Sequence, residues 1–360
     1  MEECVDFLDG LRKPIKSEDR KSEKGLYPYY GASGIIDYID GFIFDGEYIL
    51  LSEDGANIID RNYRVAFIAK GKIWVNNHAH VLQPHNGFDI NFLSETLERL
   101  NYAVYNTGTT MPKLNQEVCR NINLKIPATK EQNKIGNLLS LLNERIATQN
   151  KIIDKLQSLI KGINQNVFTD DGFNYMLKEL CEIRSGYSGN QLTSKNGLKV
   201  SRIETISGHK VNIERVGYVA QFASSENFKL QIGDILFSNI NSVEYIGNTA
   251  FIDKDYGLYH GMNLLRLTPN NLVVIPFYLY LLLNTNKMQN HFKTICNKAV
   301  SQASINQTEL GKTVVKIPSI KVQKQICELY QSLYNKLKTE NNAISLLQKQ
   351  KQYLLRQMFI

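Results

Sequence analysis

Basic and amide side chains gather in two segments of this 360-residue chain. The first segment, residues 12–24, carries six basic residues against three acidic ones. The second, residues 187–202, combines lysine and arginine with serine, asparagine and glutamine. Charged groups of this kind contact phosphates, and amides, hydroxyls and guanidinium groups contact the edges of bases. Both segments are therefore candidate contacts for a nucleic acid.

Two further runs of polar residues extend these candidates. The YPYYGASG run beginning at Tyr27 offers tyrosine and serine near a glycine turn, and it is either a contact surface or a packed corner. The SNINS run, residues 238–242, offers serine and asparagine. The predicted DNA contacts are Arg12, Lys13, Lys16, Arg20, Lys21, Tyr29, Tyr30, Ser33, Tyr187, Ser188, Asn190, Gln191, Lys195, Lys199, Arg202, Ser238, Asn239 and Asn241.

Motifs for catalysis and cofactor binding are missing from the sequence. There is no GxGxxG after a strand, no GxxxxGK(S/T) phosphate loop, and no (N/D)PP(Y/F) tetrad of the amino-methyltransferases. The run Pro28-Tyr29-Tyr30 lacks the polar residue and the second proline of that tetrad. We therefore predict no catalytic residue and no cofactor held by this chain.

His78 and His80 alternate along a strand-like run and could be taken for a metal pair. No cluster of carboxylates or cysteines supports them in the sequence, so we expect structural histidines and no metal. The five cysteines are scattered without a CxxC pair, which indicates reduced, buried thiols.

Charge and hydropathy limit the class of protein. The net charge of +7 mildly favours an anionic partner, and residues 321–360 carry a net +5 while residues 1–125 carry a net −4. No apolar run reaches membrane-spanning length, and the first ten residues lack a signal-peptide pattern. We expect a cytoplasmic protein with no membrane partner.

The elements that must position these residues are duplicated. The run from Gly108 to Ile135 aligns without a gap on the run from Ala299 to Ile326, at an offset of 191 residues. The register persists through the helical segments that follow. The globular parts match more weakly, with ECVDFLDG on ELCEIRSG at an offset of 176, GEYILLS on GDILFS at about 187, and HVLQP on LRLTP at 185.

Periodicity predicts an α/β (α+β) chain of two similar halves. Strand patterns cover residues 41–52, 63–69, 72–84, 211–222, 233–238 and 248–253, and short helices are expected near 92–105 and 276–292. Helical period runs over 130–168 and 322–358. We predict a first domain at 1–128, a spacer helix at 129–169, a second domain at 170–320 and a spacer helix at 321–360. Two such copies related by a two-fold axis must run their helices antiparallel, as a coiled coil.

The order of these pieces resembles the specificity (S) subunits of type I restriction–modification enzymes over essentially the whole chain. The similar pieces are the YPYYGASGI run, the LSEDGA run at Leu51, and the LxxxxIxxPxxxEQxxI-type junction into each helix. One departure is Val322, which stands in the second junction where the first has Glu131. The resemblance implies two DNA target-recognition domains and no catalysis in this subunit. It also implies two methyltransferase (modification) subunits and ATP-dependent restriction (translocase) subunits as partners, which would hold S-adenosylmethionine, ATP and Mg.

The repeat pattern by itself predicts a related function. Similar helices imply two equivalent docking surfaces, and divergent globular domains imply two different half-sites in double-stranded DNA. The expected target is therefore bipartite and asymmetric, with a fixed gap. Two alternatives stay open, which are a degenerate DNA-modifying enzyme and a coiled-coil adaptor that does not bind DNA.

Overall fold

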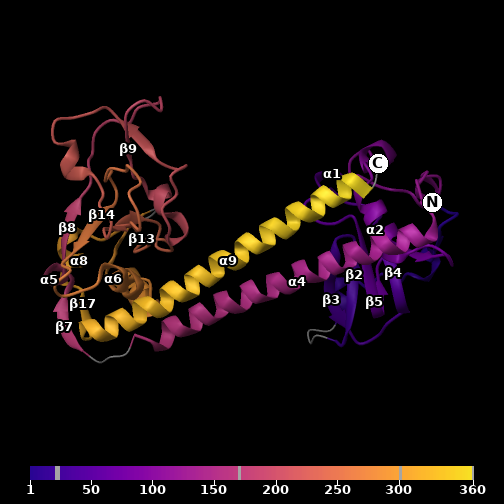
Figure 1. The fold of residues 1–360 in the computed structure, drawn as a ribbon, viewed down its shortest axis with the longest axis horizontal. Helices are drawn as coiled ribbons and strands as arrows, with labels where there is room; N and C mark the ends of the chain where they lie inside the picture. The colour runs from indigo at the N-terminus through magenta and orange to yellow at the C-terminus, as the bar shows by residue number, and fades with distance from the viewer. Residues whose placement is uncertain (21–24, 169–171, 300–301, 359–360) are drawn as a thin grey trace. The chain divides into compact units, whose positions relative to one another are not determined.

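The computed structural model describes residues 1–20, 25–168, 172–299 and 302–358 (Figure 1). It divides into a first unit, Met1–Lys151 with Asn342–Ile360, and a second unit, Ile152–Asn341. The division passes through both long helices, α4 (Thr129–Asn166) and α9 (Ile320–Met358). Each helix therefore supplies one half to each unit. None of the helices in the described ranges is apolar enough over a sufficient length to cross a bilayer.

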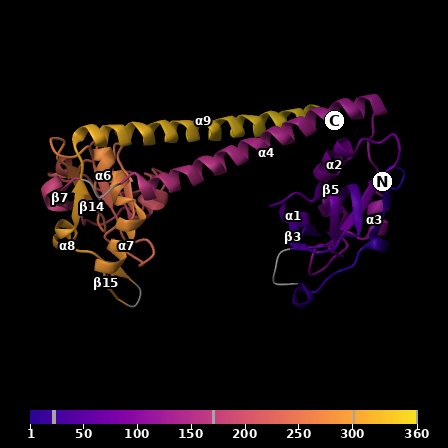
Figure 2. The same ribbon diagram turned by 90° about the horizontal axis from the view of Figure 1, so that it is seen from below.

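The first unit is built on a six-stranded sheet in the order β1-β6-β4-β5-β2-β3. Its neighbours are antiparallel except β2 and β5, which pair in parallel. The helix α2 packs on β4 and β5 (Figure 2). The elements are β1 (Val5–Phe7), β2 (Tyr27–Gly31), β3 (Gly34–Ile39), β4 (Phe44–Ser52), α1 (Asn57–Asp60), β5 (Ala66–Val75), β6 (Ala79–Pro84), α2 (Ile90–Arg99) and α3 (Gln116–Arg120), with 3-10 turns at Asp9–Leu11, Ser17–Asp19 and Tyr102–Tyr105.

The last four residues of strand β4, Ile49–Ser52, are buried on both faces, which explains the continuous apolar run there. Ile49 and Leu51 face the core that includes Leu93 of α2, whereas Leu50 faces a second core with Ile73. Side chains alternate between the two faces of a strand, so consecutive apolar residues require cover on both sides.

The predicted strand at 72–84 is wrong as a single element. Residues up to Val75 complete β5, and β6 begins at Ala79. Between them the Oδ1 atom of Asn76 accepts a bond from the backbone N–H of His78 (2.8 Å), which closes a turn. Asparagine makes such local bonds readily, so it ends a strand that hydropathy alone would continue.

The second unit contains a four-stranded antiparallel sheet in the order β13-β11-β14-β8, with smaller sheets around it. Its elements are β7 (Phe173–Met176), α5 (Leu177–Leu180), β8 (Cys181–Ser185), β9 (Leu198–Val200), β10 (Gly217–Val219), β11 (Ile235–Phe237), β12 (Ile240–Asn241), β13 (Thr249–Phe251), β14 (Leu265–Pro269), α6 (Pro276–Leu283), α7 (Asn286–Ile295), β15 (Asn297–Lys298), β16 (Ala303–Ser304), α8 (Gln307–Lys312) and β17 (Val314–Ile317), with 3-10 turns at Ile203–His209 and Ser225–Phe228.

Each unit contains its own copy of this four-stranded sheet, and the strands of the two copies correspond one to one. The order β8-β14-β11-β13 in the second unit repeats β1-β6-β4-β5 in the first. Val5 lies opposite Pro84 as Cys181 lies opposite Pro269. Ile49 lies opposite Leu82 as Ile235 lies opposite Leu267. The weak matches in the sequence therefore mark equivalent strands, and the predicted fold class with its internal repeat is confirmed.

Two predicted elements of the second unit are shorter than expected. The strand pattern at 211–222 yields only β10, because a turn closed by Asn212 precedes it, with Glu214 N–H donating to the Asn212 side chain (3.0 Å). The helix expected at 276–292 is two helices, because the Thr285 hydroxyl caps α7 by accepting from Met288 N–H (3.3 Å). Side-chain caps of this kind compete with a continuous helix.

A buried glutamine joins each long helix to its globular unit. Gln132, in the first turn of α4, accepts a bond from Asp89 N–H (3.1 Å) and donates to Pro127 O (2.9 Å). Gln323, in α9, accepts from Ile275 N–H (2.8 Å) and donates to Pro318 O (2.9 Å). Asp89 and Ile275 are the residues that precede α2 and α6. The repeated glutamine thus fixes the start of α2 or α6 to the start of a long helix.

Replacing either glutamine by leucine is expected to lower the free energy of unfolding by about 1–3 kcal/mol, because buried backbone groups lose their partners. Urea unfolding of Gln132→Leu and Gln323→Leu measures this. Gln157 and Gln348 are a matched control pair, since they also align at 191 residues but are exposed. A midpoint shift in Gln157→Leu or Gln348→Leu as large as in the buried pair would contradict the assigned role.

Candidate nucleic-acid interface

The polar loops of the first unit fall into an exposed group and a group used inside the fold. Lys13 and Lys16 are exposed, and Lys16 lies 3.6 Å from Glu18 across solvent. Ser33 is exposed in the turn that joins β2 to β3. Lys21 lies outside the described residues. These exposed positions are the ones that a nucleic acid could reach.

Tyr29 and Tyr30 of β2 are packed inward. Tyr29 is buried, and its hydroxyl accepts a bond from Ile15 N–H (2.9 Å). The guanidinium of Arg20 lies over the Tyr29 ring, 5.4 Å from its centroid, and pairs with Asp37 (3.3 Å). Tyr30 packs on Phe67, and burial raises the pKa of Tyr30. Of the two roles considered for this run, the packed corner describes both tyrosines.

Arg12 is committed to an internal ion network, which argues against its predicted DNA contact. Its Nη1 atom donates to Glu53 (2.7 Å) and to Ala79 O (2.7 Å), and Nη2 lies 3.5 Å from Asp9. Only 12% of the side chain is exposed. A guanidinium held by two carboxylates has little positive charge left to offer a phosphate.

His80 completes this network as a buried cation. Its Nδ1 atom is 2.6 Å from Asp9 and its Nε2 atom is 2.8 Å from Leu114 O. Since the carboxylate and the carbonyl both accept, both ring nitrogens donate, and the ring is an imidazolium. Burial lowers the pKa of His80, but the bonds to Asp9 and Cys119 and the charge of Asp9 raise it to about 10. Burial raises the pKa of Asp9, yet the bond and charge of His80 bring it below the usual range.

The carboxylates that lie beside His78 and His80 were not predicted from the sequence. Asp9 and Glu53 flank His80 closely enough to ligate a metal, and Asp54 lies 2.8 Å from His78. They come from segments 24 to 71 residues distant, so spacing gave no sign of them. The chemistry of the set favours an ion network over a metal, because Arg12 already neutralises the carboxylates and His80 donates from both nitrogens. The structural role expected for His80 stands on this geometry.

In the second unit, the candidates of residues 187–202 gather around β9 and β10. Lys199 lies opposite Tyr218, and Gln191 pairs with Val219 as an isolated bridge. The side chains of Gln191 and Arg202 both lie beside Gly217. Lys195, Lys199 and Arg202 are exposed, as are Ser188, Asn190 and Gln191. The structure thus brings Gln191, Lys199 and Arg202 to one small hairpin, which we call the β9–β10 hairpin.

Tyr187 supports this region from within. Its ring stacks on Phe222 with centroids 3.8 Å apart, and Phe228 meets both rings edge-on. Its backbone N–H donates to His260 O (2.9 Å). An aromatic cluster of this kind holds a loop-rich segment in place, so Tyr187 is better explained as a support than as a contact.

The SNINS run is a structural element. Asn239 O accepts a bond from Ile305 N–H (2.9 Å), as Glu53 O accepts from Leu114 N–H (2.7 Å) in the first unit. Ser238 is fully buried, and Asn241 donates to its hydroxyl (3.1 Å). Ser238, Asn239 and Asn241 thus hold the segment that leads into α8, which disfavours all three as DNA contacts.

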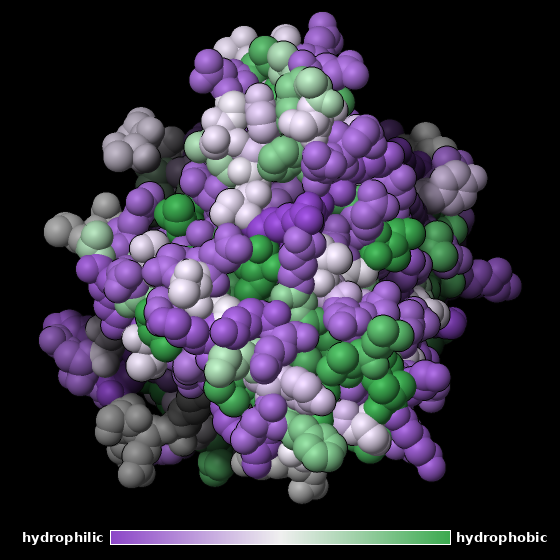
Figure 3. Space-filling view, turned by 90° about the vertical axis from the view of Figure 1, so that its left-hand side faces the viewer, coloured by the Kyte–Doolittle hydropathy of each residue, from purple (hydrophilic) through white to green (hydrophobic). Residues whose placement is uncertain are grey.

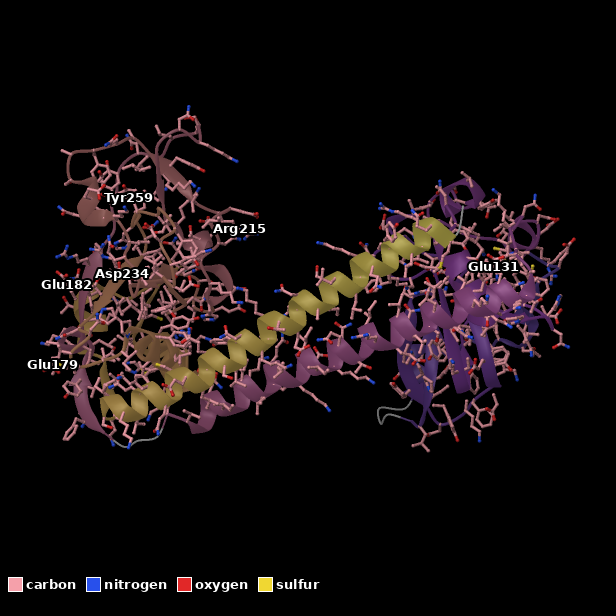
Figure 4. All side chains as sticks on the ribbon, in the orientation of Figure 1. Glu131, Glu179, Glu182, Arg215, Asp234 and Tyr259 are labelled. Atoms are coloured by element: carbon pink, nitrogen blue, oxygen red, sulfur yellow. The ribbon has the colours of Figure 1, made fainter. Side chains whose placement is uncertain are left out.

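Arg215 is a candidate that the sequence analysis did not select. It is exposed, it lies two residues before β10, and Figure 4 labels it in the second unit. Its carbonyl accepts a bond from the Thr205 hydroxyl (2.6 Å), which fixes the backbone near Arg202. It lay within a run predicted as strand, and only the hairpin pairing shows that it lies near the 187–202 segment.

The face of the second unit in Figure 3 is mostly hydrophilic, with scattered hydrophobic side chains.

His80 predicts a pH dependence. Its pKa rises from 6.5 in the unfolded chain to about 10 in the folded one, so its stabilisation is complete below pH 6.5 and is lost as pH rises toward 10. His80→Gln should lower the free energy of unfolding by about 3 kcal/mol at pH 6, and the deficit should narrow toward pH 10. Urea titrations at several pH values measure it. His78→Gln is the exposed control, and a pH-independent deficit in His80→Gln would refute the charged state.

Comparison with known proteins gives a consistent result. A family model described as the type I restriction modification DNA specificity domain matches residues 5–158 and 172–349. The putative type I restriction enzyme MjaX specificity subunit of Methanocaldococcus jannaschii is 42% identical over 187 residues, which cover 51% of this chain and 44% of that protein. The putative specificity subunit S.HindORF215P of Haemophilus influenzae is 25% identical, over 98% of this chain and 92% of that protein.

A solved structure shows a similar fold. The S subunit of a type I restriction–modification system from M. genitalium superposes with a TM-score of 0.69, covering 100% of this chain and 94% of that chain. The identity of 16% limits this likeness to the fold. Glu131, labelled in Figure 4, and Val322 are both exposed, so the departure at the second junction leaves the core unchanged.

Proposed function

Because the chain belongs to the family of type I restriction–modification DNA specificity domains, we propose that it selects the DNA target of such a complex and is not itself a catalyst. In this proposal each unit binds one half of a bipartite, asymmetric site. The long helices dock two methyltransferase subunits, and restriction subunits join through them. S-adenosylmethionine, ATP and Mg belong to those partners. The observation that carries the proposal is that both units contain the same four-stranded arrangement but attach different hairpins and loops to it.

Different additions to the shared sheet support two different half-sites. The first unit adds the β2–β3 hairpin at the edge of β5, while the second carries the separate β9–β10 hairpin. Sequence is read by side chains at base edges, so unlike loops select unlike bases. An asymmetric target follows from this difference.

We place the interface of the second unit at the β9–β10 hairpin. Lys195 and Arg215 supply exposed positive charge, and Gln191, Lys199 and Arg202 lie at or beside the strands. Arg202 lies 3.5 Å from Glu204, and that pair is half exposed, so a phosphate can compete for it. In the first unit, the exposed candidates are Lys13, Lys16 and Ser33.

Equivalent exposed features on the long helices support two copies of one partner. Leu138 of α4 and Leu329 of α9 align at 191 residues and are 39% and 42% exposed. Exposed leucines at matching positions are suited to bury apolar surface against identical subunits.

Each unit also has a pocket where the globular part meets a long helix. The pocket in the first unit, of about 510 Å³, is lined by Leu124, Lys125 and Met358 among others. The pocket in the second, of about 450 Å³, is lined by the repeat equivalents Val315 and Lys316, with Phe168 near the end of α4. A paired pocket with a lysine in the same place supports docking of the same segment twice.

Charge reversal at the β9–β10 hairpin tests DNA recognition. Lys195→Glu with Arg202→Glu should weaken binding about tenfold or more and reduce the slope of log K against log salt by about 1 for each lost phosphate contact. Gel shifts of the chain with its modification subunit measure the affinity and its salt dependence. The DNA probe carries the sequence motif that is found methylated in the genome of the host. The control Lys178→Glu with Lys254→Glu reverses two exposed lysines elsewhere in the second unit. Equal loss in both pairs would remove this hairpin from the interface.

Substitution of the matching leucines tests docking. Leu138→Glu or Leu329→Glu alone should leave one modification subunit bound in place of two, and the double variant should bind none. The mass of the complex in native mass spectrometry reports the stoichiometry. Leu159→Glu changes an exposed leucine whose repeat partner is Gln350, and we expect it to keep both subunits. Two bound subunits in the double variant would refute this surface.

A further inference from the structure

A buried ion cluster holds the C-terminal half of α9 in the first unit. One carboxylate oxygen of Glu95, in α2, accepts bonds from Arg64 (2.8 Å), Asn143 of α4 (3.0 Å) and Lys351 of α9 (3.1 Å). Lys351 also donates to the Asn143 side-chain oxygen (2.7 Å). The side chains of Glu95 and Lys351 are 4% and 13% exposed. The cluster of Glu95, Asn143 and Lys351, which we call the polar triad, thus joins α2, α4 and α9.

The polar triad stays charged. Burial raises the pKa of Glu95, but the charge and bond of Arg64, the charge of Lys351 and the bond from Asn143 lower it below the usual range. A buried carboxylate in this state depends on its partners, since removing one leaves a charge without compensation.

The same positions in the second unit are apolar. The equivalent glutamines Gln132 and Gln323 accept bonds from the backbone of Asp89 and of Ile275, so these two residues are equivalent. Six residues further along, Glu95 of α2 is therefore equivalent to Leu281 of α6. The offset of 191 aligns Asn143 with Tyr334 and Lys351 with Ile160. Ile160 and Leu281 belong to one hydrophobic core of that unit, and the partly buried Tyr334 packs against it. An apolar triad therefore stands where the first unit has the polar triad.

One helical turn further along, the polarity is reversed. Leu355 of α9 is buried in the first unit, and its repeat equivalent in the second is Asn164, which accepts a bond from the Tyr330 hydroxyl. Each unit thus requires a different pair of residues from the helix that it receives. In the first unit α9 supplies Lys351 and Leu355, whereas in the second unit α4 supplies Ile160 and Asn164.

This difference matters because α4 and α9 are repeats of one another. The second half of α4 from another copy has the length and register to replace the second half of α9 in the first unit, which is how identical elements exchange between chains. Such an exchange would set Ile160 against Glu95 and leave Asn164 in the place of the buried Leu355. The reciprocal exchange would put Lys351 into the apolar triad of the second unit.

We propose that the polar triad is a selectivity site, through which the first unit accepts its own α9 and rejects α4 of a second copy. The chain then closes on itself and does not exchange helices between copies. A single buried polar position fixes register and partner choice among repeated helices in the same way. The proposal does not depend on DNA binding.

The test uses the full chain with two different affinity tags, unfolded together in urea and refolded by dilution. Capture on one tag and quantification of the other gives the fraction of mixed complexes. Glu95→Leu with Lys351→Ile, which makes the first unit resemble the second, should raise this fraction at least tenfold over the wild type while the chain still folds. Either substitution alone should destabilise the first unit, and the double variant should recover part of that loss.

Two controls separate selectivity from loss of stability. Lys349→Ile changes an exposed lysine on the same helix, and Leu93→Ala weakens the core of α2 without touching the polar triad. Both should refold with as few mixed complexes as the wild type. Ile160→Lys with Leu281→Glu is a second route, since it gives α4 the lysine that the first unit requires, and it should also raise the mixed fraction. If both double variants stay at the wild-type level, the proposal is wrong.

Discussion

In each unit a buried glutamine ties the first turn of a long helix to the backbone at the start of a shorter one. Gln132 and Gln323 are 2% and 0% exposed, and each bonds one backbone N–H and one proline carbonyl. A side chain buried to this extent must satisfy both its donor and its acceptor, so it tolerates little displacement. The direction in which each helix leaves its unit is therefore fixed locally. The globular part of each unit is attached to its long helix at this joint.

A joint that is made twice separates the constant parts of the chain from the variable ones. The residues that keep the offset of 191 are those that the joint and the helices use, such as the Ile-Pro pair before each helix. The loops that carry exposed charge do not keep it, because nothing in the joint depends on them. Under the proposed function, substitution in β2–β3 or β9–β10 would change DNA recognition while both helices keep the same surface for partners.

The long helices and the repeated strands could be predicted from the sequence, whereas the state of most polar loop residues could not, and the reasons are physical. Helical period and the repeat reveal α4, α9 and the equivalent strands, since burial leaves a regular pattern. The network of Asp9, Glu53 and His80 left no pattern, because it is assembled from three distant segments. Arg12 and Ser238 look like contacts in a sequence, yet one is neutralised and the other is buried. Polar residues in loops show which side chains could bind, and only the fold shows which are already bound.

The departures from the repeat carry as much information as the repeat itself. A chain with two identical halves could pair α4 with α9 or with another α4 through contacts of equal free energy, and only the linkage of the two helices in one chain would favour closure. The two helices differ at these positions, since α9 has Lys351 and Leu355 where α4 has Ile160 and Asn164. This difference removes the equality, because each mismatched pairing leaves either a buried charge or a buried amide without a partner. Hydrophobic burial along the helices supplies the affinity, while a few polar positions decide which half of which helix is accepted. The same division, with constant residues for shape and divergent residues for choice, applies to the loops of the two units.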